Sequence, residues 1–405
     1  MSVKLTRSIA IPSLFILVLM ISVGPFGDTI YAPVLPSIAQ AFDTAYHNVQ
    51  LTITFYLFGY ALSQILYGPF SDRFGRKPVM IIGAVTFLIG SLTCLISGNI
   101  TILILGRFIQ GFGACAGAVI SSAAVRDAFT GIEQAKVFAK MNTAFAIAPG
   151  LGAIVGTFFS WQINFSVLFA LAIILLIAVL WLFPETLKQK NKGATRPHRL
   201  IVNYWQLFQT RGYLVYLCIL GLNIGMVYSC LVEAPALVIT TLNLSKPWFI
   251  VIAAGIVIAF MLGSMICSFL CQRISQHQIL LIGMLISLSG GSMMLVFMSL
   301  GIIKLLTLLV PVVIIFTGIA FVIPIATARA LAPFAKTAGS ASAMMGFFQM
   351  GMASAITACV TALPLSDTLA LPVSFATLAT IAIVIFSLYL LTHKAAHFKG
   401  RKTVK

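Results

Sequence analysis

The chain has 405 residues, of which 60% are hydrophobic and only 8% are charged. An ordinary soluble domain carries about 25% charged residues, so the composition excludes that class and favours a membrane protein. A net charge of +17 would suit a nucleic-acid-binding protein, but the long apolar runs and the mean hydropathy of +1.08 exclude that role, together with disorder and a disulfide-stapled secreted scaffold.

Apolar segments long enough to cross a bilayer recur along the whole chain. A hydrocarbon core of about 30 Å needs about 20 apolar residues in a helix, and about twelve segments reach that length. They cover residues 9–39, 48–71, 78–97, 100–125, 137–158, 164–183, 211–238, 247–271, 279–300, 303–328, 338–362 and 371–392. We therefore predict an all-α membrane protein with twelve transmembrane helices, whose first segment is an uncleaved helix rather than a signal peptide.

The distribution of basic residues predicts how these segments are oriented. Nearly all of the 25 basic residues fall in alternate links, among them Lys4, Arg7 and the tail that ends at Lys405. Cytoplasmic loops carry the excess of Lys and Arg, so both termini and the link 184–210 are predicted to be cytoplasmic. Lys246 and Lys304 lie on the other side.

The most polar stretch of the chain, residues 184–210, divides the segments into six and six. Such symmetry is typical of transporters built from internal repeats, whose substrate site lies near the membrane midplane. The predicted organisation is an N-terminal six-helix bundle at 1–183, a cytoplasmic linker at 184–210, a C-terminal six-helix bundle at 211–392 and a basic cytoplasmic tail at 393–405.

Two acidic residues, Asp28 and Glu233, fall within apolar segments. An ionised Asp at a helix centre costs about 2.5–3.5 kcal/mol on insertion scales, so a carboxylate there indicates a function. On a helix, Gly24, Tyr31 and Ala32 would share the face of Asp28, which suits a cavity that water can reach. We expect Asp28 to load and release a proton; the alternative is a hydrogen bond to a neighbouring helix.

Arg107 is the matching cation, inside the fourth segment, with Gln110 on the same helix face. An unpaired guanidinium in a membrane is costly, so Arg107 should face the bundle interior and bind a carboxylate or backbone carbonyls. Its predicted role is to modulate the proton affinity of Asp28 or to polarise the cavity, and a purely structural pairing is the alternative. The predicted substrate cavity includes Tyr31, Gln110, Glu233 and Gln349.

The sequence lacks the motifs of enzymes, metal sites and nucleotide-binding proteins. All five histidines fall in links or at segment ends, and no HExxH, GxSxG or GxxxxGK[ST] motif occurs. The seven cysteines lie in or at the edge of apolar segments, without metal-ligand spacing. We therefore predict that the protein is not an enzyme, holds no cofactor or metal and draws its energy from a gradient.

Three groups of motifs resemble a known family. The loop after the second segment, GPFSDRFGRKP from Gly68 to Pro78, resembles the GxxxDRxGRK motif of the major facilitator superfamily. RFIQG, from Arg107, is similar to the RxxQG motif of its drug/proton antiporters. More narrowly, the chain resembles the bicyclomycin/chloramphenicol resistance branch, Bcr/CflA, in four segments: DTIYAPVLPSIA, VRDAF, FPETL and ALAPFAKTAGSASAMMGFFQ. The fifth-helix antiporter motif GxxxGPxxGG is incomplete, because its best register lacks the proline and the last glycine.

The resemblance implies that the GPFSDRFGRKP loop is a cytoplasmic gate. Asp72 would face the amino end of the eleventh helix, Arg73 or Arg76 would pair with Asp127, and glycines would permit close approach. The predicted gate residues are Gly68, Asp72, Arg73, Gly75, Arg76 and Asp127. The alternative is a loop that serves only membrane topology.

Together these patterns predict a proton-coupled multidrug exporter of small apolar or amphipathic compounds, working by alternating access as a monomer in a bacterial inner membrane. Its partners would be a small-molecule substrate, protons and the lipid bilayer, and no nucleic acid. The alternatives are a proton-linked exporter of a physiological metabolite such as a siderophore, an importer on the same fold, and a non-transporting membrane sensor or assembly factor.

Overall fold

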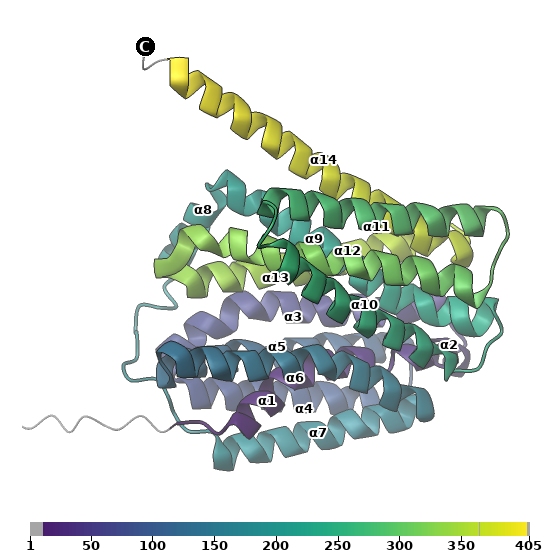
Figure 1. The fold of residues 1–405 in the computed structure, drawn as a ribbon. Helices are drawn as coiled ribbons and strands as arrows, with labels where there is room; N and C mark the ends of the chain where they lie inside the picture. Colours follow the sequence, from purple (N-terminus) through teal and green to yellow (C-terminus); the bar gives the residue numbers. More distant parts are fainter. Residues whose placement is uncertain (1–10, 364, 403–405) are drawn as a thin grey trace, which may run out of the picture. The chain divides into compact units, whose positions relative to one another are not determined.

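The computed structural model describes residues 11–363 and 365–402, and in this part of the chain the regular elements are all helical (Figure 1). Within these residues, 12 stretches of helix are long and apolar enough to cross a membrane. The predicted fold class is therefore confirmed. Lys4, Arg7 and Lys405, which contributed to the predicted topology, lie outside the described residues.

Two compact units divide the chain. The first unit contains residues up to 31 and 55–203, and the second contains residues 32–54 and those from 204 onward. Helices of the first unit are α1 (Leu14–Thr29), α4 (Arg76–Leu95), α5 (Ile100–Ala128), α6 (Gly131–Phe158) and α7 (Trp161–Leu182). Helices of the second unit are η1 (Ala32–Val34), α2 (Leu35–Ala41), α9 (Arg211–Ala236), η2 (Leu237–Thr241), α10 (Trp248–Leu270), α11 (Gln276–Ser299), α12 (Leu305–Leu331), η3 (Ala332–Thr337), α13 (Ala338–Ala362) and α14 (Asp367–Lys402). Residues of both units form α3 (Tyr46–Phe74) and α8 (Pro197–Phe208).

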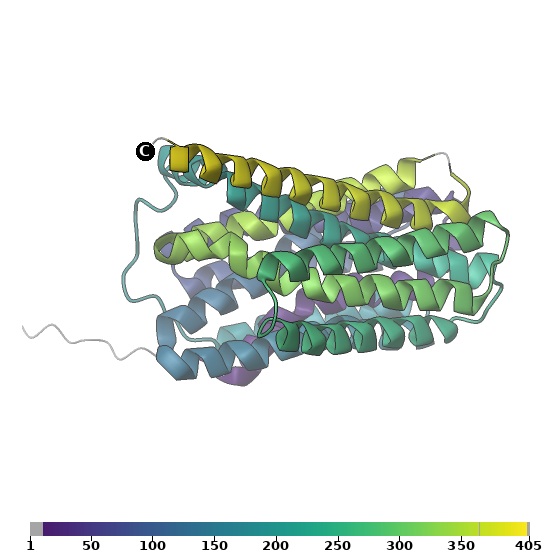
Figure 2. The same ribbon diagram turned by 45° about the horizontal axis from the view of Figure 1, so that its top comes forward.

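Similar helix pairs occur in the two units. In the first unit α4 packs along α5, and in the second α11 packs along α12. Both views show α11 and α12 side by side (Figures 1 and 2). Each pair is joined by a short link, so the two helices run antiparallel, and the beginning of the first lies beside the end of the second.

Capping side chains fix where several helices begin. The hydroxyl of Ser13 accepts a hydrogen bond from the backbone of α1 at 3.4 Å, and the amide oxygen of Asn99 accepts one from α5 at 2.9 Å. Ser275 and Gln278 form a capping box at the beginning of α11. These side chains satisfy backbone N–H groups that the first helical turn leaves without partners, which is why the helices begin there.

The first predicted span, residues 9–39, is interrupted in the structure. Helix α1 ends at Thr29, and the chain continues through η1 into α2. Pro33 explains the interruption, because proline lacks an N–H group and disfavours helical geometry in the residue before it. Asp28 therefore lies in the last turn of α1, and Ala32 lies in η1, not on the helix face that we expected.

Two further segments extend the predicted elements. Helix α8 forms within the predicted linker 184–210, and α14 continues to Lys402, beyond the predicted end of the last span at residue 392. Part of the predicted linker and most of the predicted tail are thus helical. The assignment of residues 1–183 and 211–392 to two six-helix bundles stays a prediction.

Helices α1 and α6 pack so closely that Gly156 has no room for a side chain. A β-carbon at Gly156 would overlap the backbone carbonyl of Ile30. Small residues permit such approaches between membrane helices. We expect Gly156→Ala to lower the free energy of unfolding by about 1–3 kcal/mol, measured by thermal unfolding in detergent. In the control Gly68→Ala, the added methyl group meets nothing within 4 Å; an equal loss of stability in both variants would contradict the explanation.

Candidate proton site and gate

Asp28 is buried in the last turn of α1, with an exposed fraction of 5%. Tyr56, from α3, lies close enough to interact electrostatically with the Asp28 carboxylate. The hydroxyl group of Tyr56 donates a hydrogen bond to the carbonyl oxygen of Gly24 at 2.9 Å, one turn before Asp28. The carboxylate thus lies inside the protein, at the end of an interrupted helix.

Arg107 is fully buried between two aromatic rings of the first unit. Its guanidinium carbon is 4.0 Å from the ring centroid of Tyr31 and 4.1 Å from that of Tyr56. Such cation–π contacts stabilise a desolvated guanidinium. Its Nη1 donates a hydrogen bond to the Gly27 carbonyl at 3.1 Å, next to Asp28. Among the described residues, Nε and Nη2 of Arg107 meet no hydrogen-bond acceptor.

Gln110 holds Arg107 in this position. Its amide oxygen accepts a hydrogen bond from Nη1 of Arg107, and its amide nitrogen donates to Ser91 Oγ at 2.8 Å. Ser91 in turn donates to the carbonyl of Phe87 at 2.8 Å. Gln110 has an exposed fraction of 0% and both ends of its amide are engaged, so in this structure it positions Arg107.

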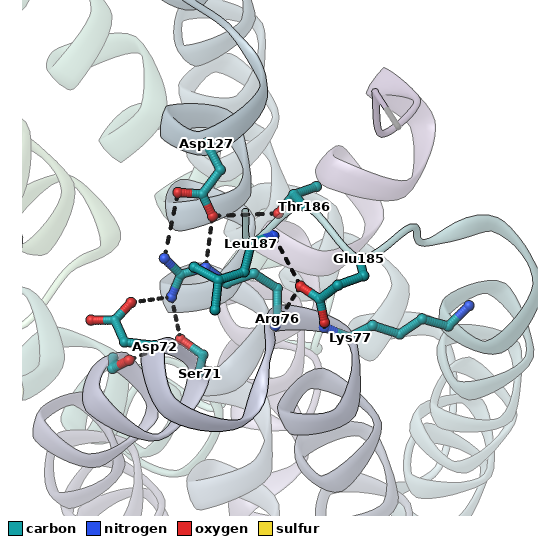
Figure 3. Close-up of polar contacts among 9 residues, drawn as sticks. Ser71, Asp72, Arg76, Lys77, Asp127, Glu185, Thr186 and Leu187 are labelled. Atoms are coloured by element: carbon teal, nitrogen blue, oxygen red, sulfur yellow. Dashed lines mark hydrogen bonds and ion pairs between the residues drawn. The ribbon is translucent and has the colours of Figure 1, made fainter. Parts of the chain in front are cut away.

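Arg76 is the centre of a second polar cluster in the first unit (Figure 3). Its Nε donates to Asp127 Oδ2 at 2.8 Å, and its Nη1 donates to Asp72 Oδ1 at 2.5 Å and to Ser71 Oγ at 2.7 Å. Of the two candidate arginines, Arg76 pairs with Asp127, whereas Arg73 donates to Thr195. The cluster joins the end of α3, the beginning of α4 and the end of α5.

Glu185, which the sequence analysis did not place in the gate, caps α4. Its carboxylate accepts hydrogen bonds from the backbone N–H groups of Arg76, at 2.9 Å, and Lys77, at 3.3 Å. An anion is favoured at a helix amino terminus by the helix dipole. Gly75 has a φ of 114°, and a β-carbon there would overlap the Glu185 carboxylate. The expected close approach is therefore present at Gly75 but not at Gly68, where nothing lies within 4 Å.

Glu233 belongs to a polar cluster of the second unit. Its exposed fraction is 4%, and its Oε1 accepts a hydrogen bond from Gln50 Nε2 at 2.9 Å. One residue earlier, the Val232 carbonyl accepts a hydrogen bond from Tyr46 at 2.8 Å. Further along the same helix face of α3, Thr54 contacts Thr357 and Ser354 of α13. The remaining predicted cavity residue, Gln349, is half-buried on α13.

The structure thus places a buried carboxylate and a buried cation on adjacent membrane-spanning helices of the first unit, and ion pairs close the link between α3 and α4. In a multi-pass membrane protein, buried charges of this kind mark pathways for ions or small-molecule substrates. The sequence pattern of the Major Facilitator Superfamily matches residues 17–358, and the chain belongs to that superfamily.

Named relatives support the predicted branch. Multidrug resistance protein D of Escherichia coli is 28% identical over 340 residues, which cover 83% of this chain and 85% of the relative. A bicyclomycin resistance protein homolog of Haemophilus influenzae is 32% identical over 231 residues, which cover 54% and 56%. The crystal structure of a peptide transporter, POT, in complex with sulfate has a TM-score of 0.77 at 14% identity and covers 97% of this chain and 98% of that one, which shows a shared fold.

Proposed function

We propose that the protein is a proton-coupled exporter of small apolar or amphipathic compounds. The observation that carries this proposal is the burial of Asp28 beside Arg107, whose side chain is fixed by Gly27 and Gln110. A carboxylate inside a membrane bundle is suited to carrying protons. The multidrug and bicyclomycin resistance names of relatives support drug-like substrates.

In the proposed cycle, a proton from outside neutralises Asp28 and the substrate is released. The substrate site then becomes accessible from the cytoplasm instead of from outside. Loss of the proton to the cytoplasm prepares Asp28 for new substrate. Tyr31, Glu233 and Gln349 are proposed substrate-contacting residues. Glu233 and Gln349 are polar groups on membrane-spanning helices, and Tyr31 lies in the turn between α1 and η1. The two free donors of Arg107 suit a polar group on the substrate.

The energy available to this cycle is sufficient for useful export. Entry of one proton is worth about 2.3 kcal/mol per 100 mV of membrane potential. Since about 1.4 kcal/mol corresponds to a tenfold concentration ratio, typical potentials support gradients of roughly tenfold to hundredfold.

The Arg76 cluster is the proposed cytoplasmic gate, comprising Gly68, Asp72, Arg73, Gly75, Arg76 and Asp127. Its ion pairs hold the end of α3, the beginning of α4 and the end of α5 together. The protein would work as a monomer in the inner membrane of a bacterium, with both termini in the cytoplasm, as the distribution of basic residues favours.

Uptake into everted membrane vesicles tests the function. Respiration acidifies the vesicle interior, so a proton-coupled exporter should accumulate bicyclomycin or a fluorescent amphipathic dye there. We expect accumulation that an uncoupler abolishes and that vesicles without the protein lack. Uptake into right-side-out vesicles instead would favour an importer, and absence of flux in both orientations would favour a sensor or assembly factor.

A further inference from the structure

A third polar cluster lies where the beginning of α11 meets the end of α12, in the second unit. His277, the second residue of α11, has its Nε2 atom 2.5 Å from Nη2 of Arg329, in the last turn of α12. Tyr216, from α9, has its hydroxyl 3.3 Å from Nε of Arg329 and 3.5 Å from Nε2 of His277. The cluster connects three helices at the predicted cytoplasmic end of the unit.

The chemistry of arginine fixes the protonation state of His277 in this arrangement. A guanidinium has only N–H donors and stays protonated, so Nε2 of His277 must accept the hydrogen bond from Arg329. The imidazole is then neutral, with its proton on Nδ1. A proton on Nε2 would remove the acceptor and place two cations in contact, at a helix amino terminus that already disfavours positive charge.

Neighbouring helices bring a cation, phenols and an aromatic ring to His277. Helix α12 contributes Arg329, α9 contributes the Tyr216 hydroxyl, and α14 contributes the ring of Phe386, 6.0 Å from the imidazole. Tyr389 of α14 packs against Tyr216, with ring centroids 6.0 Å apart. The cation among these contacts, Arg329, is the group that touches Nε2 of His277.

The Arg76 cluster occupies the corresponding position in the first unit. There the beginning of α4 meets the end of α5 through Arg76 and Asp127, as the beginning of α11 meets the end of α12 through His277 and Arg329. Carboxylates are ionised throughout the physiological pH range, whereas an imidazole titrates between about pH 5 and 8. The Arg76 cluster of the first unit and the His277–Arg329 contact of the second unit therefore differ in their response to acid.

We propose that His277 is a proton-binding site, distinct from Asp28, whose occupancy loosens the contact between α11 and α12. At neutral pH the imidazole accepts the hydrogen bond from Arg329, and the first turn of α11 stays in contact with the last turn of α12. When the solution at this end is acidified, protonated His277 repels Arg329 and the first turn of α11 separates from the last turn of α12. The site does not depend on the proposed transport cycle.

Hydrogen–deuterium exchange of the purified full-length protein tests this site, at roughly pH 5.5 and pH 7.5, after correction for intrinsic exchange rates. We expect exchange in the first turn of α11 and the last turn of α12 to be several-fold faster at the lower pH. In His277→Gln the amide oxygen still accepts from Arg329 but does not titrate, so exchange should be equally slow at both values. The control His198→Gln replaces an exposed histidine and should respond to acid as the wild type does.

Arg329→Gln supplies a second variant that separates repulsion from general destabilisation. Protonated His277 can donate to the new amide oxygen, so acid should no longer accelerate exchange in the first turn of α11 and the last turn of α12. Equal exchange at both pH values in the wild type would overturn the proposal. Acid-induced loosening that persists unchanged in either His277→Gln or Arg329→Gln would overturn it as well.

Discussion

Replacing Asp28 by asparagine should abolish proton-driven export and leave the protein in the membrane at wild-type amounts. Asparagine has nearly the same shape, and Arg107 keeps its contacts with Tyr31, Tyr56 and Gly27. The amide cannot carry a proton, so the step that couples proton entry to substrate release is lost. Gradient-driven uptake into everted vesicles should fall to the level of vesicles without the protein.

Two comparisons separate lost coupling from lost folding. Asp28→Asn should still exchange labelled for unlabelled substrate in counterflow, because exchange needs binding and access but no net proton movement. The matched control is Asp43→Asn: Asp43 is exposed, and its φ of 46° is one that asparagine also adopts. Proton-driven uptake at an undiminished rate in Asp28→Asn would reject the proposed mechanism.

The sequence was sufficient to predict the twelve spans, because a bilayer permits very few backbone structures. Every backbone polar group in hydrocarbon must be paired internally, so a long apolar run forms a helix. The interruption after Thr29 was missed, since an apolar run that contains Pro33 and Pro36 remains apolar on average. Hydropathy reports whether a segment enters lipid, whereas the local geometry of proline decides whether it stays one helix.

The sequence indicated the charged members of the site but not their uncharged partners. Asp28, Arg107 and Arg76 are conspicuous because a charge in or near a membrane is costly. Tyr56 and Gln50 give no such signal, because hydroxyl and amide groups are common in membrane helices. Gln50 contacts Glu233 across 183 residues of sequence, a pairing that only the tertiary structure reveals. Polar side chains inside apolar segments were the one signal that could have indicated them.

Replacing Arg107 by lysine should nearly abolish transport although the positive charge is kept. The planar guanidinium stacks between the rings of Tyr31 and Tyr56 while Nη1 binds Gly27 and Gln110. A lysine ammonium is a compact point charge that cannot make both ring contacts and both hydrogen bonds together. Loss of one desolvated ring contact, worth about 2 kcal/mol, corresponds to a roughly thirtyfold effect.

The matched control for this variant is Arg126→Lys, on the same helix α5 but at an exposed position. Proton-driven uptake should fall at least about thirtyfold in Arg107→Lys and stay near the wild-type rate in Arg126→Lys. Since Gln110 positions Arg107 by accepting a hydrogen bond from its Nη1, Gln110→Leu should lower uptake in the same direction, and its effect should not add fully to that of Arg107→Lys. Wild-type uptake in Arg107→Lys would mean that only the charge matters, and fully additive losses would mean that Gln110 acts separately from Arg107.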